Sequence, residues 1–229
     1  MRYVYIESCQ GGNRMDFENI YNTYSSTIAE YGDFELPVPT FVIDKKIDFK
    51  LLIALLLRSN NNIQDDYRYL DYCKLNIKEL CMELDISSKT LKNRMKYLED
   101  KGILKYVNSS RGLILRINYS KEGKYYIKVS HTTLKCLLES VSNNSIKVYF
   151  LLKIYYEIFK SNKPVTLAYL CSQLGYATNN KRNLDNMSRW SNELVEHDLV
   201  DKNKFRIYKQ NSNGKKVIER VDTYYKIKR

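Results

Sequence analysis

Residues 76–119 change hydrophobic period once, and this change limits the folds open to the chain. In the first half, apolar side chains recur three and four residues apart in two runs, as they do on one face of a helix. The turn Asp85–Ser87 separates the runs, and Ser87 or Ser88 suits the cap of the second helix. After residue 102, apolar and polar residues alternate on both sides of Asn108–Gly112, which predicts a β-hairpin. A helix, a turn, a second helix and a hairpin form the winged helix-turn-helix pattern.

The second helix of this pattern has an apolar face and a basic face. Between Ser87 and Lys101, five basic residues stand against two acidic ones, and both acids lie at the far end. A helix of about 20 Å, at 1.5 Å per residue, fits a major groove about 12 Å wide. The alternative is an ordinary solvated helix face. We expect DNA contacts from Ser88, Lys89, Thr90, Lys92, Asn93 and Lys96, and from Arg111 in the hairpin turn.

The chain as a whole is strongly basic, with a net charge of +12 and an isoelectric point near 9.3. Such a balance indicates a polyanionic partner. Residues 1–35 run against it, because two arginines and six acidic residues give them a net charge of −4, which leaves +16 on residues 36–229. We interpret residues 1–35 as an acidic N-terminal arm. It pairs with a second copy in a homodimer, folds over the chain's own basic face or stays mobile.

The sequence gives little support for a membrane protein, an enzyme, a metal-binding protein or a disulfide-bonded protein. The longest apolar run, Leu51–Leu57, is far shorter than the roughly 20 residues of a membrane span, so we expect no membrane contact and a cytoplasmic location. The two histidines lie far apart, and neither a phosphate-binding loop nor a zinc-binding cysteine pairing occurs. We therefore expect no enzymatic activity, no metal and no cofactor. The scattered cysteines predict reduced, buried thiols rather than disulfides; they are Cys9, Cys73, Cys81, Cys136 and Cys171.

The elements upstream of the helix-turn-helix complete a first domain, residues 36–121. The prolines of ELPVP, residues 35–39, exclude helix and predict an extended lead-in. Asp48–Ser59 is apolar on most sides and predicts a central core helix. The polar run Asn60–Asp66 predicts a loop, and Tyr69–Leu75 predicts a short strand beside the hairpin.

An internal repeat predicts a second domain of the same kind, residues 122–229. KELCMELDIS (Lys78–Ser87) aligns with AYLCSQLGYA (Ala168–Ala177) at an offset of ninety residues. Further on, KYLEDKGIL (Lys96–Leu104) aligns with NELVEHDLV (Asn192–Val200) at an offset of ninety-six. The second copy therefore has about six extra residues between its turn and the end of its second helix.

The rest of the second domain follows the first. Thr132–Val141 predicts a short helix and Ile146–Phe159 a core helix, and the segments Lys204–Gln210 and Lys215–Val221 predict a second hairpin, with Tyr224–Ile227 as a last strand. The expected fold is α+β, mainly α with small β-wings. It consists of two tandem winged helix-turn-helix domains.

The second groove-sized helix, within Asn179–Asp198, differs from the first in charge. It holds three basic and four acidic residues, whereas Lys202–Arg229 carries a net charge of +8. Phosphate attraction in this half is thus expected from the hairpin and C-terminus, and Trp190 is expected to pack in the core. The predicted DNA-contacting residues are Lys181, Arg182, Asn183, Asn186 and Arg189 on the helix, with Lys215 and Lys216 in the hairpin.

Two phrases carry a family resemblance. FELPVPTFVIDKKIDFKLLIALLLRS (residues 34–59) and HTTLKCLLESVSNNSIKVYFLLKIYYEIF (residues 131–159) resemble tandem winged-helix replication initiators of plasmids and phages from low-GC bacteria, of the initiator protein A type. The likeness covers roughly residues 34–205 and depends on apolar pattern. It implies binding to repeated origin sites and, as partners, replication proteins. The chain departs from the family in its short, polar first wing, and we expect no C-terminal helicase-loader-binding domain.

Three hypotheses follow for function. The first is a sequence-specific double-stranded DNA-binding protein that initiates plasmid or phage replication. The second is a transcriptional regulator that uses the same surfaces on an operator. The third is a protein-interaction module built from winged helices.

Overall fold

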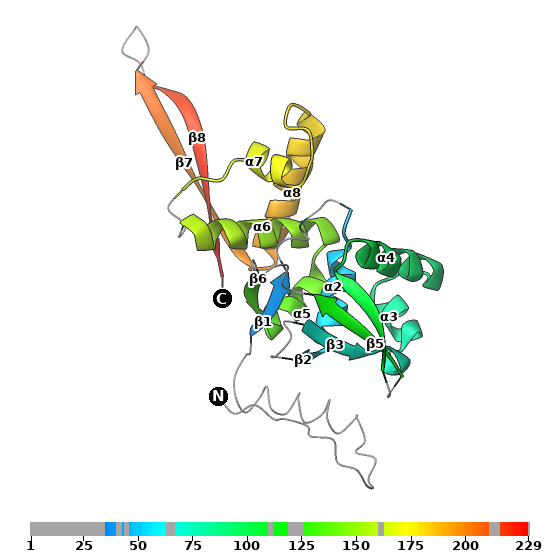
Figure 1. Cartoon of the computed structure of the whole chain (residues 1–229). Coiled ribbons are helices and arrows are strands. Elements are labelled where there is room, and N and C mark those ends of the chain that lie inside the picture. Colours follow the sequence, from blue (N-terminus) through cyan, green and yellow to red (C-terminus); the bar gives the residue numbers. More distant parts are fainter. Residues whose placement is uncertain are drawn as a thin grey trace. The chain divides into compact units, whose positions relative to one another are not determined.

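The computed structural model describes residues 35–39, 43, 46–62, 67–109, 112–118, 126–159, 163–210 and 216–228. In these ranges the fold is mixed α+β, with three antiparallel sheets (Figure 1). The helices are α2 (Phe49–Leu57), α3 (Ile77–Glu83), α4 (Ser88–Asp100), α5 (His131–Ser140), α6 (Asn143–Phe159), α7 (Leu167–Gln173) and α8 (Lys181–Glu196), with the short 3₁₀ helix η1 (Tyr72–Lys74). The strands are β1 (Glu35–Pro39), β2 (Asn60–Asn62), β3 (Tyr67–Asp71), β4 (Leu104–Ser109), β5 (Gly112–Asn118), β6 (Tyr126–Ser130), β7 (Val200–Gln210) and β8 (Lys216–Ile227).

The predicted helix, turn, helix and hairpin are present in the first half. The side chains of Asn76 and Ser87 accept hydrogen bonds from the third backbone N–H after them, and so begin α3 and α4. Leu91, Met95 and Leu98 are buried along one side of α4. β4 and β5 pair as a hairpin directly after α4, and the sheet has the order β2-β3-β5-β4.

Three predicted strand and loop assignments need correction. Asn60–Asn62 lies within the predicted loop but pairs with β3 as a strand. The predicted strand Tyr69–Leu75 ends at Asp71, because the Asp71 carboxylate accepts a hydrogen bond from the backbone N–H of Cys73 and starts the 3₁₀ turn. Tyr224–Ile227 is no separate strand, since it continues β8 and pairs with β7 to the end.

The internal repeat is confirmed as repeated local structure. α3 and α7 have equal length and begin ninety residues apart, and each is followed by a left-handed residue, Asp85 at φ 51° and Gly175 at φ 72°. α4 and α8 end ninety-six residues apart and are likewise followed by Gly102 at φ 70° and Asp198 at φ 58°. A left-handed residue of this kind satisfies the last carbonyls of a helix. The two segments therefore end their helices by the same device.

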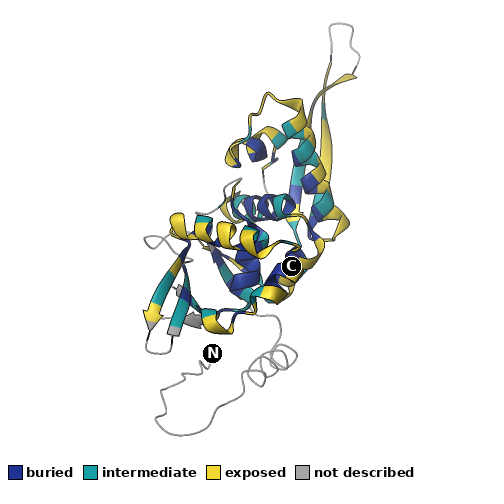
Figure 2. Cartoon of the chain, turned by 90° about the vertical axis from the view of Figure 1, so that its right-hand side faces the viewer, coloured by how far each residue is buried: buried dark blue, intermediate teal, exposed yellow. Residues whose placement is uncertain are grey.

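The two predicted domains share their central packing. β1, expected in the first domain, pairs with β6, expected in the second. α2 packs against α5 and α6, where the rings of Phe49 and Phe150 lie 5.2 Å apart. Residues 35–229 form one compact unit, and the buried residues concentrate on these central helices and the inner faces of α4 and α8 (Figure 2). The boundary between residues 121 and 122 stays a prediction. Of the predicted arm, Glu35 is the first residue of β1, and residues 1–34 lie outside the described residues.

A side chain of α6 caps α2 across this packing. Asn143 Oδ1 accepts hydrogen bonds from the backbone N–H of Phe49 at 2.7 Å and of Lys50 at 3.2 Å, while Asn143 Nδ2 donates to the Ile47 carbonyl at 3.4 Å. The first N–H groups of a helix have no partner within the helix. Asn143 therefore supplies α2 with acceptors that its own sequence does not provide.

We expect Asn143→Ala to lower the free energy of unfolding by about 1 kcal/mol, the typical cost of losing an N-cap acceptor. Urea denaturation followed by circular dichroism measures this change. Asn144→Ala is the matched control, since Asn144 is the next residue of α6 and is half-buried. It should change stability by less than about 0.5 kcal/mol. Equal losses in the two variants would contradict the capping role of Asn143.

Candidate nucleic-acid interface

The exposed face of α4 is basic from Lys89 to Lys96, and the acidic residues Glu99 and Asp100 are exposed only at the end of the helix. Lys89, Lys92, Asn93 and Lys96 are all exposed, opposite the buried Leu91. None of the three lysines forms an ion pair with any residue that the structure describes. Ser88 is exposed at the start of the helix, and Thr90 is half-buried, with its hydroxyl 2.9 Å from that of Ser87. The structure thus brings together the six residues that were predicted on this helix.

Arg94 has a different role from its basic neighbours on α4. Its guanidinium pairs with the carboxylate of Asp48, the N-cap of α2, which is itself 7% exposed. The other oxygen of Asp48 accepts from the backbone N–H of Leu51 at 3.2 Å. The pair therefore holds α4 against the start of the central helix. Sequence pattern does not predict this pairing, because the two residues lie 46 positions apart.

The hairpin that follows α4 is described only in part. Lys105 is exposed on β4, while β5 buries Leu115 and Ile117 against the body. Arg111, predicted to contact DNA from the turn, lies outside the described residues. The described strands show that the hairpin stands directly beside the end of α4 (Figure 1).

The exposed face of α8 is mixed in sign, as its composition predicts. Lys181, Arg182 and Arg189 are exposed, but Asp185 lies exposed among them. Trp190 is buried at 7% exposure, which confirms its predicted place in the core. The helix therefore offers a weaker attraction to phosphate than α4 does.

The two asparagines that were predicted on α8 are occupied by local contacts. Asn183 Nδ2 donates to the Ala177 carbonyl at 3.0 Å, which fastens the turn between α7 and α8. Asn186 Oδ1 accepts from Arg189 Nη2 at 3.3 Å. Both asparagines are half-buried. Local structure thus explains Asn183 without a DNA role, while the Asn186–Arg189 pair stays at the helix surface.

The second hairpin, β7 and β8, joins α8 at its base. Lys202 Nζ donates to Ser191 Oγ at 3.1 Å and to Asn192 Oδ1 at 2.7 Å, and the Tyr225 hydroxyl donates to Ser191 Oγ at 3.3 Å. Burial, together with the nearby Lys204, lowers the pKa of Lys202. Lys216 is exposed on the outer part of the hairpin, and Lys215 lies outside the described residues.

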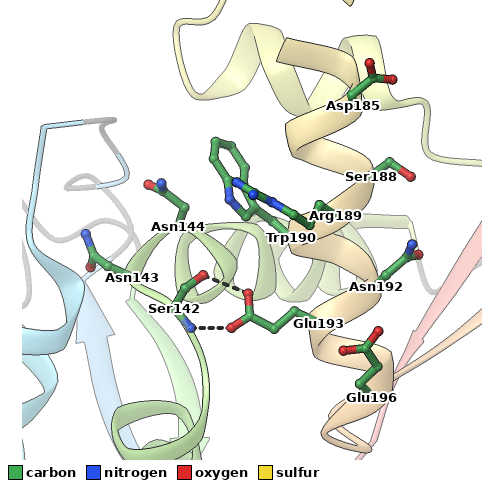
Figure 3. Close-up of a pocket in the computed structure, with 10 residues that line it drawn as sticks. All are labelled: Ser142, Asn143, Asn144, Asp185, Ser188, Arg189, Trp190, Asn192, Glu193 and Glu196. Atoms are coloured by element: carbon green, nitrogen blue, oxygen red, sulfur yellow. Dashed lines mark hydrogen bonds between the residues drawn. The ribbon is translucent and has the colours of Figure 1, made fainter. Parts of the chain in front are cut away.

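An open hollow lies between the start of α6 and one side of α8 (Figure 3). Glu193 of α8 lines the hollow and accepts hydrogen bonds from the Ser142 N–H at 2.6 Å, from the Ser142 hydroxyl at 2.8 Å and from the Ser145 hydroxyl. Burial alone would raise the pKa of Glu193, but these hydrogen bonds outweigh it and hold the pKa below its ordinary value. In the sequence analysis, Glu193 enters only as one of the acidic residues of its helix. Because it lies opposite the start of α6, it acts as a capping group there.

The described residues offer few groups for metal binding or thiol chemistry. No group of three or more His, Cys, Asp and Glu side chains in these ranges is placed to hold a metal ion. Cys81 and Cys171 are buried free thiols as predicted, whereas Cys136 is half-buried and Cys73 is exposed, because η1 turns that side chain outward. The prediction that all the cysteines are buried is wrong for these two, and Cys9 lies outside the described residues. Among the helices described, none has the length and apolar character needed to cross a membrane.

In comparisons with known proteins, no family model, no curated protein and no solved structure matched the chain. The resemblance to replication initiators therefore stays a prediction.

We expect the stabilising effect of Glu193 to depend on pH. Because its pKa is lower in the folded chain than in the unfolded one, its contribution is complete above the unfolded pKa of about 4.3. It is lost as the pH falls through the folded pKa. Wild type should therefore be more stable than Glu193→Gln at neutral pH, and the difference should shrink in acid. Urea denaturation between neutral and acidic pH measures it.

Glu196→Gln serves as the control, since Glu196 lines the same hollow and is exposed. This variant should follow the wild-type pH dependence. A stability difference for Glu193→Gln that stayed constant at every pH would show that the charge of Glu193 is not what matters.

Proposed function

We propose that this protein binds double-stranded DNA through two tandem winged helix-turn-helix units. The observation that carries the proposal is the face of α4, a capped helix whose exposed lysines form no ion pair with described residues. Free cations in a row on a rigid helix match the phosphates that flank a groove. The adjoining hairpin β4–β5 stands where a winged helix has its wing.

In this proposal the two units contribute unequally to DNA affinity. α4 enters a major groove, and Asn93, at the centre of its basic face, suits the donor and acceptor pattern of an adenine edge. α8 offers Lys181, Arg182 and the Asn186–Arg189 pair beside Asp185, so its unit gains its phosphate attraction from the hairpin β7–β8. The first unit is therefore the main source of affinity.

The biological role we propose is initiation of plasmid or phage replication, and the support for it is the resemblance of residues 34–59 and 131–159 to initiators. Replication proteins would then be partners of the bound complex. Footprinting on DNA beside the gene tests this role. A series of repeated protected sites is expected; a single operator-like site would favour the transcriptional regulator instead.

Binding should depend steeply on salt. Neutralisation of about eight phosphates gives a slope near −7 in a plot of log affinity against log salt concentration. Lys89→Ala and Lys96→Ala should each weaken binding to specific and random duplexes alike and reduce the slope by about 1. Lys135→Ala, at an exposed position of α5, is the control and should leave both quantities unchanged. Affinity independent of salt would contradict DNA binding and favour a protein-interaction module.

Asn93→Ala should change which base is preferred rather than overall affinity. A lost bidentate contact costs about 1–3 kcal/mol of discrimination at one base pair. Selection of bound sequences from a random duplex pool, with wild type and variant in parallel, shows the relaxed position. Equal losses on selected and random DNA would exclude base reading by Asn93.

A further inference from the structure

The outer part of the hairpin β7–β8 is exposed (Figure 2), and several of its exposed side chains are large and apolar. Its side chains interleave with the cations Lys204, Arg206, Lys209 and Lys216. Exposed apolar groups concentrated in one place mark a surface of interaction. The exposed fractions are 57% for Phe205, 51% for Tyr208, 36% for Val217, 51% for Ile218 and 49% for Val221.

The hairpin is held to the body near its base. Thr223 accepts a hydrogen bond from the Val165 N–H at 2.8 Å, and Lys202 and Tyr225 bond to Ser191 of α8. Beyond this point the two strands continue as a ribbon (Figure 1). A two-stranded ribbon by itself is marginally stable in water. The outer part therefore gains from a partner that covers it.

The strand register separates the two faces of this ribbon. Opposed residues share a face and successive residues alternate, so Lys202 and its partner Tyr225 share their face with Lys204, Arg206 and Tyr208. The same face carries Val221 opposite Arg206, Ile218 opposite Tyr208 and Lys216 opposite Gln210. Since Lys202 and Tyr225 contact Ser191, this is the face on the α8 side. We call it the inner face.

The inner face combines cations with an apolar pair. Lys204, Arg206 and Lys216 belong to it, and none of the register pairs named above brings an acidic residue onto it. The opposite face contains Asp222, paired with Phe205. A register shift between Ile207 and Tyr208 increases the local twist next to the Tyr208–Ile218 pair. Arg206 and Lys216 flank the pair along the inner face, while the exposed Glu219, which has no register partner at the shift, is the neighbour of Ile218 in sequence.

We propose that the inner face contacts the minor groove of the duplex held by α8 and that Tyr208 and Ile218 wedge between base pairs and bend it. This inference depends on the proposed DNA binding. Apolar side chains inserted from the minor groove partly unstack one step and bend a duplex by about 20–90°. The flanking cations match the phosphates on either side of such a wedge.

The positive charge of the inner face disfavours a second copy of the chain as its partner. Two identical inner faces related by a two-fold axis would bring Lys204 and Arg206 of one copy toward the same cations of the other. DNA presents the opposite charge to the same residues. Duplex DNA is thus the partner that both the apolar pair and its cations fit.

Energy transfer between dyes at the two ends of a duplex tests the inference. The probe is a duplex of about 20 base pairs, short against the DNA persistence length of about 150 base pairs, with a sequence selected by the wild-type chain from a random pool. Wild type should increase the transfer. The double variant Tyr208→Thr and Ile218→Thr, which keeps strand-forming residues, should leave the transfer near that of free DNA. Its affinity should stay within about tenfold of wild type, because phosphate contacts supply most of the affinity.

Val217→Thr is the matched control, since Val217 is the neighbour of Ile218 on the opposite face. It should bend DNA as wild type does, and circular dichroism should show all variants folded. Steep salt-dependent binding to an unbent duplex, or equal bending by wild type and the double variant, would overturn the wedge and leave the proposed function standing. Failure of wild type to bind any duplex would overturn both. Sedimentation that showed a wild-type dimer and a monomeric double variant would assign this surface to a second copy.

Discussion

The arrangement of this protein depends on hydrogen-bond acceptors placed at the N-termini of two central helices. Asp48 and Asn143 supply them for α2, and Glu193 supplies them where α6 begins. A buried helix start without such partners would leave N–H groups unsatisfied, at a cost of about 1–3 kcal/mol each. Asp48 is the N-cap of α2 itself, but Asn143 and Glu193 come from other elements of the chain, so this part of the helix capping forms together with tertiary packing.

The same acceptors connect the two surfaces that we propose for DNA. Arg94 of α4 pairs with Asp48 at the start of α2, Asn143 joins α2 to α6, and Glu193 of α8 bonds to Ser142 just before α6. A continuous series of polar contacts thus runs from α4 to α8. Because each contact is directional, the series restrains the two helices against each other as well as against the core. Tandem DNA-binding units benefit from such restraint, since preorganised surfaces lose less entropy on binding.

Local sequence predicted the parts of this fold that local physics controls. The helix-turn-helix, the cap at Ser87, the left-handed Gly102 and the repeat at Leu80 and Leu170 are all present. Each depends on contacts within a few residues, or on an apolar stripe that any core would bury. The predicted basic face of α4 is exposed for the same reason, because burial of Leu91 on one side of a helix exposes the other.

The sequence by itself determined the helices and the two hairpins, their repeated order and the charge that each helix exposes, but not strand β2 or the end of β3. Tertiary structure alone decided the pairing of β1 with β6, the ion pair of Arg94 and the capping roles of Asn143 and Glu193, and it fixed Asn183 to a turn. The reason is the distance along the chain: Asn143 meets Phe49 across 94 residues and Glu193 meets Ser142 across 51. Periodicity reports which face of an element is buried, but it carries no information about which distant polar group will meet a helix end.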